Sequence, residues 1–134
     1  MKYVILIHSN PQPWGHPTSD YVAEHQALPQ AQRDALQADF ERVLTELSER
    51  GELLGGEALA DPGSARLYRW GTGRPLATDG PYAETKEYLG GLAIVDVADE
   101  AAARRWAGRL AEGCGWPQEV RRFGSAPDLD RPAG

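Results

Sequence analysis

The order of the hydrophobic patterns along the chain limits the possible folds more than any other feature. Residues 3–7 form an unbroken, β-branched apolar run, which is typical of a central strand. Residues 30–50 place apolar side chains three and four positions apart, as an amphipathic helix does. The same reasoning predicts a second helix at residues 99–112. It also predicts three more strands, at residues 53–59, 89–97 and 119–123.

A hairpin is predicted between the second strand and the strand at 89–97. Its strands would be residues 65–70 and 75–78, joined by a glycine-rich connection. When this insertion between residues 60 and 79 is set aside, the order is βαββαβ. That is the order of the ferredoxin-like α+β fold.

Local signals sharpen these predictions. Asp99 is expected to cap the second helix, and Gly51 and Gly113 are expected to end the two helices. Gly55 and Gly56 predict either a bulge in the second strand or a close approach of another backbone. Residues 8–29 contain several prolines and are expected to form a long loop with a short helix within residues 20–27.

The predicted sheet has one face without helices. Apolar side chains on that face need cover, and the common solution is to pair two sheets face to face, so we expect a homodimer. Trp14 and Trp70 fall in or beside loops, where they would line a pocket or, as we favour, the dimer interface.

Length and charge narrow the class of protein. The 134 residues suit one domain, expected over residues 1–124, followed by a flexible C-terminal tail at 125–134 that is rich in Pro, Asp and Gly. The formal net charge of −6 argues against nucleic acid and against anionic membranes as partners.

The expected location is cytoplasmic. The single cysteine, Cys114, cannot form an internal disulfide, which fits a reducing compartment, and we expect its thiol to be inert. The apolar run at the N-terminus is too short for a membrane span and is followed by no cleavage site.

The most distinctive segment is residues 78–91, with the sequence TDGPYAETKEYLGG. It resembles the signature of the DGPF proteins, a branch of the YciI-like (YCII-related) family, with Tyr82 in the place of phenylalanine. The opening strand, the segment at residues 51–59 and the acid-opened second helix fit the same family. The resemblance covers nearly all of residues 1–124.

The resemblance implies a dimeric α+β barrel built from ferredoxin-like halves. It also implies a His/Asp pair in a cleft, as in YciI-like proteins, and some relatives handle small aromatic or lactone-like compounds. Their histidine lies in the first helix, eleven residues before the glycine that ends it, and that spacing from Gly51 falls on Phe40 here. The genes of DGPF proteins often lie beside those of extracytoplasmic-function sigma factors, which suggests a regulatory context.

Three residues are the candidate catalytic groups. Asp79 ends a predicted strand before a Gly-Pro turn, where it serves either as a cap of the following amides or as a general base. Glu57 comes from another strand and could approach the same loop, so the expected pair is Asp79 with Glu57 or Glu84 with Glu57. Two carboxylates in one cleft would give an acid and a base. His8 ends the first strand, as a base or as a hydrogen-bonded structural residue.

The loop after Asp79 supplies the candidate substrate contacts, which are Tyr82, Glu84, Thr85 and Lys86. The three histidines lack metal-ligand spacing, and no glycine-rich nucleotide fingerprint occurs, so we expect no metal and no cofactor.

Two functions remain open from the sequence. One is a small-molecule enzyme that uses carboxylates for proton transfer, isomerisation or lyase chemistry. The other is a noncatalytic dimer that binds a ligand or a protein, with a sigma factor as one candidate. The polar residues around Asp79 favour the first, and the absence of the first-helix histidine favours the second.

Overall fold

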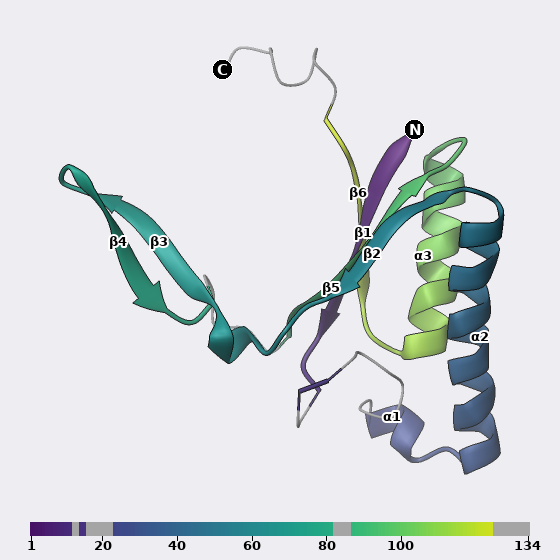
Figure 1. Cartoon of the computed structure of the whole chain (residues 1–134). Coiled ribbons are helices and arrows are strands. Elements are labelled where there is room, and N and C mark those ends of the chain that lie inside the picture. Colours follow the sequence, from purple (N-terminus) through teal and green to yellow (C-terminus); the bar gives the residue numbers. More distant parts are fainter. Residues whose placement is uncertain (12–13, 16–22, 82–86, 125–134) are drawn as a thin grey trace.

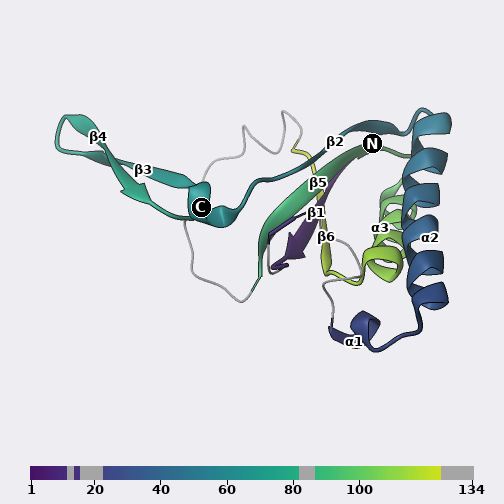
Figure 2. The same ribbon diagram turned by 60° about the horizontal axis from the view of Figure 1, so that its bottom comes forward.

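The computed structural model describes residues 1–11, 14–15, 23–81 and 87–124 (Figure 1). It shows a mixed α+β chain in which two long helices lie against one antiparallel sheet, while a separate hairpin projects from the opposite side (Figures 1 and 2). The expected tail at residues 125–134 lies outside the described residues.

The main sheet has four strands in the order β2-β5-β1-β6, and all its pairs are antiparallel. The strands are β1 (Lys2–Ser9), β2 (Leu53–Ala58), β5 (Tyr88–Asp96) and β6 (Gln118–Arg122). This order is compatible with the expected ferredoxin-like α+β fold. The expected bulge is present, because the β2–β5 register shifts between Leu53 and Gly55.

The helices α2 (Gln30–Glu49) and α3 (Glu100–Cys114) both cover the same face of this sheet (Figure 1). The expected short helix is present as α1 (Ala23–Gln26). The core between sheet and helices includes residues from both layers that are almost completely buried, among them Tyr3, Ile5, Val43, Leu47, Val95, Ala103 and Leu110. The apolar stripe of the first predicted helix therefore packs as its spacing indicated.

The helix ends follow capping chemistry, with one difference from the sequence prediction. The Asp99 side chain accepts a hydrogen bond from the Ala102 amide at 2.8 Å, as expected of a cap. Gly51 has φ 69° and ends α2. The amide of Glu52 bonds to the Leu47 carbonyl and that of Gly51 to the Ser48 carbonyl, which is a Schellman motif.

Gly113 does not end α3. The helix continues to Cys114, and Gly115 ends it in the left-handed conformation with φ 77°. Gly113 instead allows the two long helices to approach each other, because a Cβ there would lie 2.8 Å from the Phe40 Cβ. Glycine is required at this point for packing and not for a turn.

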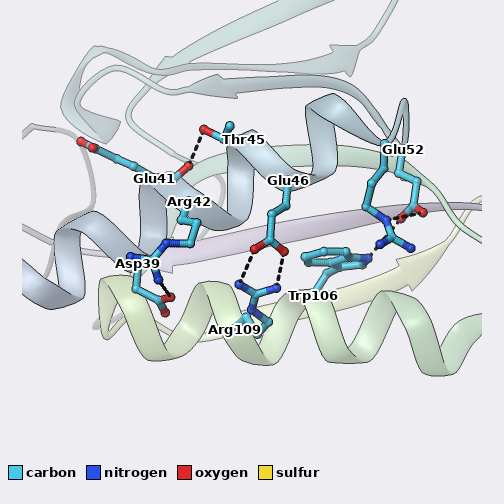
Figure 3. A network of polar contacts seen from close by, with 9 residues as sticks. Asp39, Glu41, Arg42, Thr45, Glu46, Glu52, Trp106 and Arg109 are labelled. Carbon is cyan, nitrogen blue, oxygen red and sulfur yellow. Dashed lines mark hydrogen bonds and ion pairs between the residues drawn. The ribbon is translucent and has the colours of Figure 1, made fainter.

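A polar network joins the two helices on their outer side (Figure 3). The Arg109 guanidinium donates two hydrogen bonds to the Glu46 carboxylate, at 2.7 and 3.4 Å, and lies 5.1 Å from the Trp106 ring centre. The Trp106 Nε1 donates to Glu52 at 3.2 Å. The hydrogen bond from Arg109 is the main reason why the pKa of Glu46 is lowered from its ordinary value of 4.5.

The insertion forms a hairpin of its own, with strands β3 (Arg66–Gly71) and β4 (Arg74–Asp79). These strands pair with each other and with no other strand of the described residues. The 3₁₀ turn η2 (Pro62–Ser64) precedes it. The turn between the strands uses Gly73 at φ 75°, and Gly80 follows β4 at φ 88°. The hairpin was expected from the sequence, and its projection away from the sheet was not.

Among the described residues, no helix is both long enough and apolar enough to cross a membrane.

Candidate functional site

An open cavity of about 510 Å³ lies between α2 and the helix-covered face of the sheet, beside β2. Its volume falls within the range of about 300–1,000 Å³ that is usual for small-molecule sites. Most of its wall is apolar and comes from both helices and three strands, including Ile7, Phe40, Leu44, Leu53 and Leu110. Such a wall can surround an aromatic or aliphatic group of a ligand.

The floor of the cavity consists of small residues on two neighbouring strands. Gly56 lies opposite Ala93, and Ala58 lies opposite Gly91, so the four share the face toward the helices. A Cβ at Gly91 would lie 3.1 Å from the carbonyl oxygen of Glu57, which leaves little room for a side chain. Because these positions lack bulk, the space under α2 stays open.

Polar residues occur on the α2 side of the cavity. Gln37 and Glu41 line it one turn apart, and the Gln37 amide donates to the Glu41 carboxylate at 3.2 Å. No lysine, arginine or histidine lines this cavity within the described part of the chain. The field of the Glu41 carboxylate favours a neutral or cationic ligand over an anion.

Glu57 also contributes to the cavity, but its strand register directs its side chain to the other face of the sheet. Glu57 on β2 lies opposite Leu92 on β5. Across the rest of the sheet, Leu6 on β1 lies opposite both Leu92 and Glu119 on β6. These four residues therefore share the open face. With strands about 4.8 Å apart, Glu57 and Glu119 are roughly 14 Å from each other.

His8 lies at the β6 side of this open face and is about one-third exposed. Its Nε2 is 2.9 Å from Glu119 Oε1. A carboxylate that fixes an imidazole in this way is the arrangement found in many proton-transfer sites, and also in many structural pairs.

Asp79 lies apart from the cavity. It ends β4 in the separate hairpin, its side chain is 91% exposed, and its Oδ1 is 3.4 Å from the Nε of Arg66 across the two strands. The expected pairing of Asp79 with Glu57 in one cleft is therefore not seen in the described chain. The physical reason is that Asp79 belongs to a hairpin that does not join the sheet carrying Glu57. The alternative pair, Glu84 with Glu57, cannot be placed because Glu84 lies outside the described residues.

The four candidate substrate contacts, Tyr82, Glu84, Thr85 and Lys86, lie outside the described residues. Cys114 is buried, and burial raises the pKa of its thiol. A raised pKa keeps the thiol protonated, which agrees with the expectation that it is inert.

The family model of the YCII-related domain matches residues 1–114. The chain belongs to this family. The resemblance found in the sequence is thereby confirmed. No curated protein matches the chain.

Phe40 stands at the position where the first-helix histidine of some relatives is expected, and Phe40 lines the cavity. The backbone there is held close to α3 by Gly113. This YCII-related chain therefore has an apolar ring where those relatives have a titratable group.

Sequence reasoning missed residues both of the cavity and of the His8 contact on the open face. Gln37 and Glu41 flank Phe40 at helical spacing, so the turn around Phe40 carried a signal that they would share its surroundings. Glu119 carried no such signal, because its approach to His8 depends on the pairing of β6 with β1.

Proposed function

We propose that this protein binds a small, largely apolar, neutral or cationic molecule in the cavity between α2 and the sheet. The observation that carries the proposal is the cavity of about 510 Å³ with apolar walls and a small-residue floor. The acidic side chain of Glu41 and the net charge of −6 set the preference against anions.

The test is binding of N-phenyl-1-naphthylamine, a neutral aromatic dye that fluoresces in apolar sites. The dye should bind the wild-type protein saturably. Ala58→Leu should weaken binding at least about tenfold, because Ala58 is an exposed residue that lines the cavity and a leucine would occupy its opening.

The matched control is Ala101→Leu, which adds the same side chain at an exposed position of α3 that does not line the cavity. It should bind the dye as the wild type does. Equal binding by wild type and Ala58→Leu would contradict the proposal, as would the absence of any saturable signal.

A second function is proton-transfer catalysis on the open face of the sheet. It is supported by the contact of 2.9 Å between His8 and Glu119. A screen of small aromatic and lactone compounds for turnover, followed by NMR, tests this function. His8→Gln should then abolish turnover while the dye still binds in the cavity.

We further propose that the protein is a homodimer joined through the open face, as in a dimeric α+β barrel. The support is a set of apolar side chains on the central strands of that face that are only half-buried in the single chain, namely Val4, Leu6, Leu92 and Ile94. An interface whose centre is apolar and whose edges carry charges is typical of stable pairs.

A further inference from the structure

The β3–β4 hairpin presents one aromatic face to solvent. Tyr68 is 67% exposed and Trp70 is 76% exposed. They alternate on β3, so they share a face, and the residues opposite them on β4 are Ala77 and Pro75. The face therefore has two large rings beside two small apolar residues and is uncovered within the described chain.

A hairpin of two strands has little stability of its own in water. β3 and β4 pair only with each other, and the structure describes no third strand beside them. Large exposed rings on such an element are characteristic of an interaction surface, because Trp and Tyr contribute much of the energy of protein interfaces.

The direction of the hairpin identifies the partner. In both views it extends from the side of the sheet that the helices leave open (Figures 1 and 2). A molecule that packs on the open face therefore comes within reach of the hairpin. In a twofold dimer the relation is mutual, so each copy receives the hairpin of the other.

Charge points to the same partner. The two strands carry Arg66, Arg69 and Arg74 against Asp79, a net charge of +2. Because the whole chain has −6, the remainder carries −8. A basic hairpin on an acidic chain is attracted to a second copy of that chain.

We propose that the β3–β4 hairpin is an arm that holds a second copy of this chain, with Tyr68 and Trp70 packed against the partner. This inference rests on the proposed homodimer and adds a second contact to the open sheet face. It does not depend on ligand binding in the cavity.

The first experiment measures the dimer dissociation constant by sedimentation for the wild type and for the double variant Tyr68→Ala/Trp70→Ala. The double variant should raise the constant at least about 30-fold, the effect of losing one strong interface residue. Circular dichroism and dye binding should match those of the wild type, since both rings are exposed in the single chain.

The matched control is Leu76→Ala, which removes a 43% exposed apolar side chain from the other face of the same hairpin. It should leave the dissociation constant within about threefold of the wild-type value. An equal weakening by Leu76→Ala, or an unchanged constant in the double variant, would overturn the assignment.

A second measurement uses the wild-type protein alone and avoids any loss of fold. Hydroxyl-radical footprinting should show Trp70 protected above the dissociation constant and reactive below it. Protection at every concentration would mean that the hairpin packs on its own chain, and reactivity at every concentration would mean that it stays in solvent. Either result overturns this inference, while the dye still tests the cavity independently.

Discussion

The two faces of the four-stranded sheet differ sharply although the same strands build both. On β1, Tyr3 and Ile5 point toward the helices and are 2% and 0% exposed. Their neighbours Val4 and Leu6 point the other way and are only half-buried. Both sets are apolar. The helix-covered face therefore completes the core of the single chain. The open face is equally apolar, but nothing in the described chain covers it.

The largest expected effect comes from truncating one side chain on each face. Ile5→Ala should lower the free energy of unfolding by about 2–5 kcal/mol at any protein concentration, because it opens a void in a closed core. Leu6→Ala should cost less in dilute solution and more in concentrated solution, since this side chain is half-buried in the single chain and the proposed second copy would complete its burial. Denaturant unfolding at two protein concentrations measures both. A concentration-independent cost for Leu6→Ala would contradict the account.

Two glycines of α3 allow a closed packing contact to be compared with an open position on the same helix. Gly113→Ala should destabilise the protein by about 1–3 kcal/mol, because the new Cβ would overlap the Phe40 backbone. A methyl group added at Gly108 would have no atom within 4 Å, so Gly108→Ala should stabilise by about 0.5–1 kcal/mol through helix propensity. Thermal unfolding compares the two, and a shift of the same sign in both would refute this packing argument.

The network between the helices predicts a dependence on pH. The pKa of Glu46 is lowered in the folded chain by the hydrogen bond from Arg109, so its stabilisation is present above the ordinary value of 4.5 and is lost as the pH falls through the folded pKa. The melting temperature of the wild type should therefore exceed that of Glu46→Gln at pH 7, and this difference should vanish in acid. A melting-temperature difference that grows in acid would contradict the stabilising role of the ionised Glu46.

The smallest effect is expected at Asp79. Its ion pair with Arg66 is exposed on both sides, and such pairs contribute little to stability. Asp79→Asn should change the melting temperature by no more than about a degree and leave dye binding unchanged. Loss of dye binding in this variant would mean that Asp79 takes part in ligand binding, which would contradict its placement outside the cavity.

Much of the fold follows from local patterns. The stripe around Val43 and Leu47, the cap at Asp99 and the hairpin after η2 were all predicted, because each depends on residues close in sequence. The end of α3 was predicted two residues early. Gly113 has the chemistry of a helix stop, but its contact with Phe40 comes from tertiary packing.

The candidate sites were harder to predict, since they depend on distant residues. Glu57 was expected beside Asp79, but strand pairing puts Glu57 in the main sheet and Asp79 in a separate hairpin. The His8–Glu119 contact joins residues 111 positions apart. The cavity itself depends on small residues of β2 and β5 meeting under α2, which no single segment reveals.

The most direct test of the division between the two faces is Leu6→Lys. This substitution puts a charge in the centre of the open face, opposite Glu119, while leaving the helix-covered face intact. Ala101→Lys, at an exposed position of α3, is the matched control. In sedimentation, wild type and control should have twice the chain mass of 14.6 kDa, and Leu6→Lys should have the single mass and still bind the dye. A wild-type protein that sediments at 14.6 kDa even in concentrated solution, or a Leu6→Lys variant that remains dimeric, would contradict the account.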